Sequence, residues 1–319
     1  MERNPLIYMT TFKMAEANVS SPSIAAAAKP AERVLLLNEI IMLLCIPVAI
    51  MGLIGNVIVI YLFCQRCRNS RFFLYFQNIA FANIIVLIDV FVIFQRIYLQ
   101  SNIKLFLIHL VEMLQTLGYN TRFYILTAIC AERCLILFWP AWNKRHRPRL
   151  AAIMVCAILW SLSFLTSVVD NVACNADFII TYNQFAIDCK TSNLIRIVID
   201  LVIFLPVMIQ STLAILIRTQ TLARLDVTII FTVVLYFLTD TPVRTTHNII
   251  YWIPELDVFL LITITQLLDS INCAVNPLIF VIVGCWKKTS EESVFIFLER
   301  ALEAEENMAP TREVDEEPS

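Results

Sequence analysis

The sequence is poor in charge and in histidine. Only 16% of its 319 residues are Asp, Glu, Lys or Arg, against roughly 25% in a typical soluble domain, whose surface needs that charge. The three histidines, His109, His146 and His247, lie in separate regions without metal-ligand spacing. No Ser/His/Asp set, zinc-finger spacing or basic stripe is evident. These absences predict no metal, no cofactor, no enzyme activity and no nucleic-acid partner.

Long apolar runs, in contrast, are abundant. A helix that crosses a bilayer needs about 20 mostly apolar residues, and 59% of this chain is hydrophobic. The sequence therefore predicts an all-α membrane protein, a seven-transmembrane helix bundle with the lipid bilayer as a partner. The predicted spans are 34–63, 73–99, 104–137, 149–172, 193–217, 225–252 and 256–284.

The two ends of the chain differ from this central domain, which covers residues 34–284. Residues 1–33 are polar and Ala-rich, and we expect an extracellular disordered tail without a cleavable signal peptide. Residues 285–302 place apolar side chains at helical spacing and predict a short amphipathic eighth helix on the membrane surface. A stub of disordered tail is the alternative. Residues 303–319 predict an acidic cytoplasmic tail.

Lysine and arginine are unevenly distributed between the two sets of loops, and cytoplasmic loops carry the excess. This places the N-terminus outside, where Asn18 begins a glycosylation sequon, Asn18-Val19-Ser20. The predicted cytoplasmic loops hold Arg66, Arg68, Arg71, Lys144, Arg145, Arg147, Arg149, Arg218, Arg224, Lys287 and Lys288, and the predicted extracellular loops hold only Arg96, Lys104, Lys190 and Arg196.

Several charged residues lie within the apolar spans, among them Arg122, Asp200, Asp240, Arg244 and Asp269. Charges inside a membrane are functional candidates because burying them unpaired is costly. A transporter or channel would use them for an ion path, and this is the alternative to a receptor. No internal repeat of the kind common in transporters is present.

Two motifs near the predicted cytoplasmic face suggest a switch. Glu132 and Arg133 form an adjacent carboxylate and guanidinium, whose ion pair can hold a resting state; an ordinary interfacial arginine is the alternative. Asn276 and Pro277 lie within the last span, where a proline kinks the helix and frees a carbonyl. We expect Asn276 to bond the loosened backbone or a neighbouring helix.

Taken in order, these residues resemble the landmarks of rhodopsin-like receptors, and several blocks resemble the Mas and Mas-related receptors. The resemblance covers residues 34–302 and implies a plasma-membrane receptor that binds an extracellular ligand of unknown identity and activates a heterotrimeric G protein. The landmarks are Gly55-Asn56, Glu132-Arg133-Cys134, Trp160, Pro206, Pro242 and Asn276-Pro277 with Phe280, and the Mas-like blocks are Gly118-Tyr119-Asn120-Thr121, Trp139-Pro140-Ala141-Trp142, Arg147-Pro148-Arg149 and Ser270-Ile271-Asn272-Cys273.

The resemblance also implies a disulfide and a ligand contact. No Cys occurs between Cys67 and Cys130, and Mas-related receptors join the fourth and fifth helices instead, which implies a bridge between Cys174 and Cys189. Two free thiols are the alternative. Asp170 stands where some members use a carboxylate to bind cationic peptides or amines. A second carboxylate of those members falls near Asn193, which is neutral here.

One departure from the family pattern leads to a hypothesis. Asn83 stands where rhodopsin-like receptors carry an Asp that helps to hold a sodium ion, and Arg122 stands where Mas has a Gly. Arg122 lies about 16 Å from Arg133 along the helix axis, near mid-membrane. We predict that Arg122 replaces the sodium ion and pairs with Asp240, Asp269 or both; an Arg122 that faces a water-filled cavity is the alternative.

Overall fold

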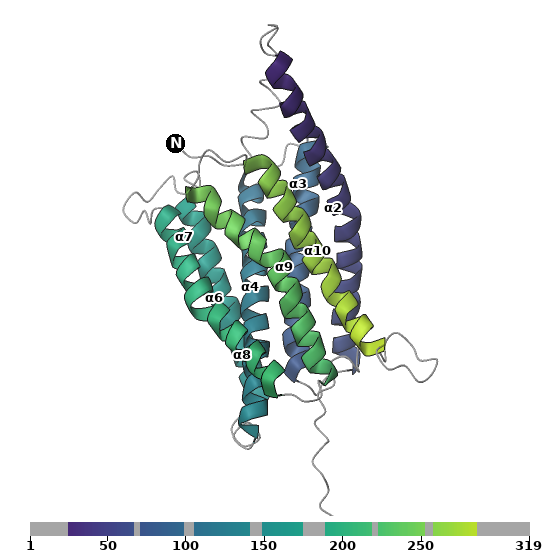
Figure 1. Cartoon of the computed structure of the whole chain (residues 1–319), viewed down its shortest axis with the longest axis vertical. Coiled ribbons are helices and arrows are strands. Elements are labelled where there is room, and N and C mark those ends of the chain that lie inside the picture. Colours follow the sequence, from purple (N-terminus) through teal and green to yellow (C-terminus); the bar gives the residue numbers. More distant parts are fainter. Residues whose placement is uncertain are drawn as a thin grey trace, which may run out of the picture.

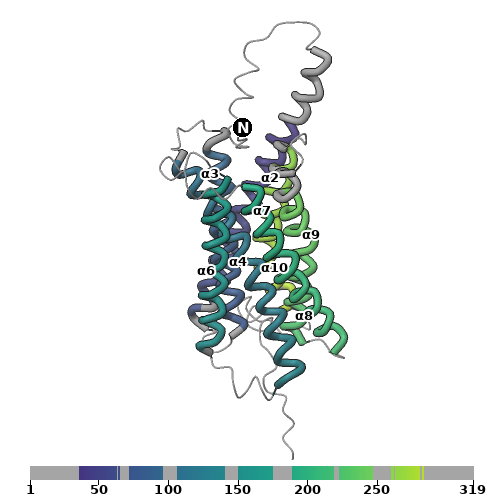
Figure 2. Tube along the Cα trace, turned by 90° about the vertical axis from the view of Figure 1, so that its left-hand side faces the viewer, coloured from purple at the N-terminus to yellow at the C-terminus, as the bar shows by residue number. Residues whose placement is uncertain are grey.

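The computed structural model describes residues 25–66, 71–98, 105–140, 149–174, 189–218, 223–252 and 258–285. Within these ranges the chain forms seven helical rods and no strand, and the rods run side by side as a bundle (Figures 1 and 2). Asn18, the predicted helix beyond residue 285 and the acidic tail lie outside the described residues. The rods are α2 (Ala25–Arg66), α3 (Arg71–Tyr98), α4 (Leu105–Phe138), α6 (Arg149–Cys174), the continuous α7–η3–α8 (Cys189–Val198, Ile199–Phe204, Leu205–Arg218), α9 (Arg224–Trp252) and α10 (Val258–Cys285).

The bundle has an apolar outside and a polar inside. Leu165, Val202 and Ile217 are among many exposed large apolar side chains, whereas Asn83 and Asp240 are buried. This distribution suits a lipid solvent, which rewards apolar surface and requires polar groups to satisfy one another internally. Five of the rods are long and apolar enough to cross a membrane: α2, α3, α6, α7–η3–α8 and α9. The fold is therefore the predicted seven-helix membrane bundle.

Helix α4 is the polar centre of this arrangement. It packs against α3, α6, α8 and α9 and lies among them in the bundle (Figure 1). Arg122, Glu132 and Arg133 of α4 are buried. The neighbouring helices supply the partners that lipid cannot.

Helix α2 begins earlier than the sequence predicts. Its helix starts at Ala25 rather than at residue 34, so the expectation of disorder is wrong for residues 25–33. Four consecutive alanines open the helix, and alanine has the highest intrinsic helix propensity. The apolar part of α2, which could cross a membrane, is Leu36–Leu62.

Two glycines allow helices to approach closely. A Cβ on Gly55 would lie 3.0 Å from the ring of Pro277, so α2 packs tightly on α10 at this proline. A Cβ on Gly118 would lie 2.8 Å from the carbonyl oxygen of Ala82, which brings α4 against α3. Larger side chains at either position would force the helices apart.

Aromatic rings fill the core of the bundle next to the buried arginines of α4 and α9. Phe123 of α4 stacks on Tyr236 of α9, with ring centroids 4.9 Å apart, and Tyr124 stacks on Phe204 at 4.1 Å. Phe280 meets Phe76 edge to face at 5.1 Å. The predicted switch residue Phe280 is thus a buried contact between α10 and α3.

Candidate functional site

The centre of the bundle contains the predicted ion pair. Arg122 of α4 contacts the carboxylates of Asp240 on α9, at 3.2 Å, and of Asp269 on α10. Its guanidinium also lies 2.6 Å from Cys273 Sγ, and all three charged side chains are at least 95% buried. The predicted contact is confirmed: one guanidinium ties α4 to both α9 and α10.

A small cavity adjoins this cluster. Its volume is about 10 Å³, and its lining includes Arg122, Asp240, Tyr236 and Asn276. Arg122 is therefore held by carboxylates beside the cavity, and the alternative of an arginine that simply faces water does not describe it. The cavity is large enough for about one water molecule.

A second buried ion pair lies one helical turn along α9. Arg244 contacts Asp200 of η3, and Tyr124 donates a hydrogen bond to the same carboxylate at 3.1 Å. The Arg244 guanidinium also sits 4.2 Å from the ring centroid of Tyr119 and 4.3 Å from that of Phe123. The π-helical turn η3 begins at Ile199, and Asp200 is buried within it. Such turns often mark functional positions in helices.

At the end of the bundle where α9 begins, the partner of Arg133 differs from the sequence prediction. Arg133 makes a two-point contact with Asp226, the first turn of α9, with Nη2 3.0 Å from Oδ2. Asp226 is fully buried, and its carboxylate also accepts a hydrogen bond from the Ala223 backbone N–H at 3.3 Å. Asp226, rather than the adjacent Glu132 that the sequence suggested, is the carboxylate that the structure places against Arg133. The lock therefore joins two helices rather than two neighbours.

The backbone carbonyl freed by the proline of α10 accepts a hydrogen bond from a different residue than expected. Pro277 has no N–H, so the carbonyl of Cys273 loses its helical partner, and Asn56 Nδ2 of α2 donates to that oxygen at 2.9 Å. Asn276 instead donates to Asn272 Oδ1 at 3.3 Å. Asn83 donates to Asn56 Oδ1 at 3.0 Å and has no bond to Arg122 within the described chain. Asn83 thus belongs to the proline network and not to the ion network.

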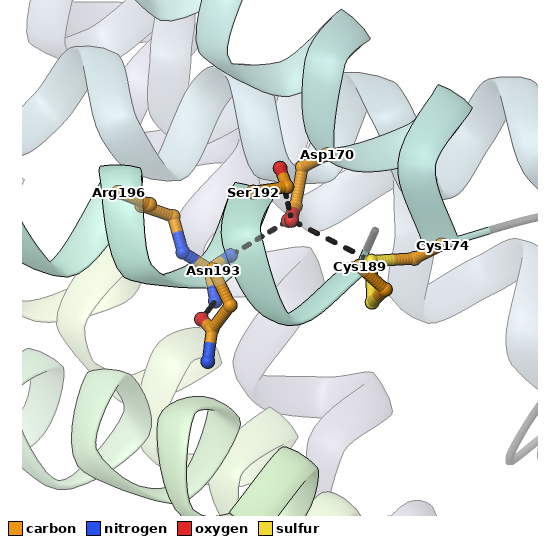
Figure 3. The surroundings of a disulfide bond; sticks show 6 residues. All are labelled: Asp170, Cys174, Cys189, Ser192, Asn193 and Arg196. Atoms are coloured by element: carbon orange, nitrogen blue, oxygen red, sulfur yellow. Dashed lines mark hydrogen bonds and ion pairs between the residues drawn. A yellow bond between two sulfur atoms is a disulfide. The ribbon is translucent and has the colours of Figure 1, made fainter. Parts of the chain in front are cut away.

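The disulfide end of the bundle, named here for the bond between Cys174 and Cys189, carries the remaining predicted residues (Figure 3). This predicted bridge is confirmed, and it joins α6 to α7. Asp170 and Asn193 lie beside it, but both are held by Arg196. One guanidinium nitrogen lies 2.8 Å from Asp170 Oδ2 and the other donates to Asn193 Oδ1 at 2.8 Å. Asp170 is therefore already paired with a cation of the chain itself.

Three of these pairings were not predicted from the sequence. Asp226 drew no attention because a single Asp near a short loop is common; its only signal is its place in the first turn of a helix. Arg196 was counted as a loop charge, although it lies within α7. Arg244 and Asp200 were noted as intramembrane charges, but their partnership depends on helix rotation that sequence spacing does not give.

Comparison with known proteins identifies the family of the chain. Residues 46–226 match the family described as "Serpentine type 7TM GPCR chemoreceptor Srx". The chain is 30% identical to the proto-oncogene Mas of Rattus norvegicus over 275 residues, 82% of this chain and 83% of that protein. It is also 30% identical to the Mas-related G-protein coupled receptor member X1 of Homo sapiens, over 82% of each chain.

Human Mas is 28% identical over 96% of this chain and 95% of its own length. The similarity therefore spans the whole helical bundle, and it favours a receptor over a transporter or channel. The helical architecture, the disulfide and these relatives agree: the chain belongs to the G-protein-coupled receptors, as a multi-pass membrane protein of the Mas and Mas-related family.

Proposed function

We propose that this receptor is held at rest by ion pairs along α9, and that ligand binding releases α9 to admit a heterotrimeric G protein beside Arg133. The observation that carries the proposal is that three charged residues of α9 each form an ion pair with another helix. Asp226 pairs with α4, Asp240 with α4 and Arg244 with η3. Movement of α9 away from α4 has to break the first two contacts.

The direction of signalling follows from the two ends of α9. In this proposal the disulfide end and the N-terminus face outside, and the Arg224 end faces the cytoplasm. Separation at the Arg224 end exposes Arg133, together with Glu132 and the α10 residues Asn276, Pro277 and Phe280. Ligand binding shifts the population only to the extent that the ligand prefers the separated packing.

The central pair supplies a built-in cation in this scheme. Arg122 occupies the middle of the bundle with two carboxylates around it. A sodium ion would add a second positive charge beside the guanidinium, and the neutral Asn83 is a poor anchor for it. We therefore propose that Arg122 takes the place of the ion and that signalling does not depend on sodium.

We further propose that Asp170 and Asn193 contribute to ligand recognition at the disulfide end. Arg196 already neutralises Asp170, so a cationic ligand has to displace that guanidinium. The Asp170–Arg196 pair then selects ligands that can take the position of the Arg196 guanidinium, and not by the charge of Asp170 alone.

The experiment is a second-messenger measurement in cells that express the chain, with a panel of cationic peptides and neutral control peptides. Ligand-evoked G-protein signalling, and its loss when G proteins are inhibited, is the expected result. Substrate uptake or ionic current without G-protein involvement would contradict the proposal. Asp226→Asn should raise ligand-free signalling, whereas Thr228→Val, a neighbouring α9 change, should leave it unchanged.

A further inference from the structure

Asp89 is the exception among the buried aspartates of the described chain. Asp200, Asp226, Asp240 and Asp269 each contact an arginine. Asp89 on α3 is 98% buried, yet within the described ranges no arginine or lysine contacts it. Its Oδ2 accepts a single hydrogen bond, from the Gln266 side-chain amide of α10 at 2.9 Å.

A lone buried carboxylate is unfavourable. Desolvation penalises its charge, and one neutral amide hydrogen bond compensates only part of that cost. Two further carboxylates, Glu112 and Asp269, act on Asp89 with like charge and add to the penalty. The site is thus electrostatically incomplete, and a positive group would relieve it.

The hydrogen-bonding groups around Asp89 specify that group further. Gln115 of α4 donates to Gln266 Oε1 at 3.1 Å, and Gln266 in turn donates to Asp89. The two hydrogen bonds therefore run in one direction, from Gln115 through Gln266 to Asp89. Two acceptor oxygens of this series, Asp89 Oδ1 and Gln115 Oε1, have no donor among the described residues. A guanidinium or primary ammonium offers several N–H donors and no acceptor, and so matches this set.

The position of these groups suits a ligand that enters from the disulfide end. Asp89, Gln115 and Gln266 lie 8–10 residues from the ends of their helices at that face, Tyr98, Leu105 and Val258, or about 12–15 Å along the helix axes. On α4, Glu112 and Gln115 are three residues apart and share one face. The Glu112 side chain is 27% exposed, so this face of α4 carries polar groups from an accessible residue down to the Gln115 level.

We propose that Asp89, framed by Gln115 and Gln266, is a cation-binding subsite for a guanidinium or ammonium group of the ligand. The inference rests on the proposed function in one respect, that ligand enters at the disulfide end. The subsite is separate from Asp170, whose carboxylate the chain's own Arg196 occupies.

A cation bound here would act on the resting ion pairs. Gln266 and Asp269 are one turn apart on α10, and Asp269 acts on Asp89 with like charge. A positive group at Asp89 repels Arg122 and competes for Asp269. Occupancy therefore weakens the contact that holds α4 to α10.

The test is thermal unfolding of the purified full-length receptor in lipid nanodiscs. The probe is butylguanidinium, and the control is butylurea, a neutral molecule of nearly the same shape. Butylguanidinium should raise the unfolding midpoint more than butylurea does for the unmodified receptor and for Asp170→Asn. Asp89→Asn should reduce the apparent affinity for butylguanidinium by about tenfold or more.

A second variant protects the test against misfolding of Asp89→Asn. Gln115→Arg places a tethered guanidinium next to Asp89, as Arg196 does for Asp170, and should abolish the butylguanidinium effect. An equal shift in Asp89→Asn and unmodified receptor, a loss in Asp170→Asn alone, or no guanidinium-specific shift at all would each overturn the subsite. A receptor that signals to a peptide but lacks the shift would refute the subsite and leave the proposed function standing.

Discussion

Asp240→Asn is the sharpest test of the resting ion pairs. The change keeps the shape of the side chain but removes one of the two carboxylates that contact Arg122. Because Asp269 stays on the guanidinium, the variant does not leave an unpaired buried charge. The receptor should fold, and the loss should fall on the resting packing, in which Arg122 and Asp240 are in contact.

The magnitude follows from the contacts. A hydrogen bond to a charged group contributes about 1.5–3 kcal/mol, and we take about 2 kcal/mol for the Asp240 contact at 3.2 Å. That corresponds to roughly a 30-fold shift toward the active packing. A receptor that is active about 1% of the time without ligand would become active roughly a quarter of the time.

The assay is ligand-free second-messenger signalling, normalised to receptor at the cell surface. Thr239→Val is the matched control, because within the described residues its hydroxyl donates to the Leu235 carbonyl of the same helix, at 2.8 Å. Replacing extracellular sodium with potassium should leave both receptors unchanged. Normal surface expression of Asp240→Asn without increased basal signalling would refute the reasoning, because the contact would then stabilise both packings equally.

Three further outcomes are expected. Arg133→Ala should bind ligand normally but couple poorly to G protein in a nucleotide-exchange assay; unchanged coupling would make the Arg133 contact structural only. Peptide mapping without reduction should recover Cys174 joined to Cys189, and a free Cys174 thiol in folded receptor would contradict the bridge. Asp200→Asn leaves the buried Arg244 without its carboxylate and should lower the free energy of unfolding by about 3–5 kcal/mol. Adding Arg244→Gln should restore much of this stability in thermal unfolding. Failure of the double variant to recover would show that loss of the ion pair is not the cause.

The ion pairs between helices differ in how far the sequence predicted them. Each charge in the apolar spans predicts a partner, because lipid offers none, and Arg122 was thereby matched to Asp240 and Asp269 from depth alone. Depth alone did not match Arg133 to Asp226. The adjacent Glu132 was the nearer candidate in the sequence, and only the packing of α9 against α4 brings Asp226 to the guanidinium.

The sequence by itself determined the membrane bundle, the family and the positions of the unusual charges. This information lies in the length of the hydrophobic spans and in the order of the landmark residues, and both can be read directly from the sequence. Only the tertiary structure decided which helix faces meet: that Asn56, and not Asn276, bonds the carbonyl freed by Pro277, that Arg196 covers Asp170, and that Asp89 has no cation within the described chain. Helix rotation sets these contacts, and a rotation of one residue, about 100°, turns a buried side chain toward lipid.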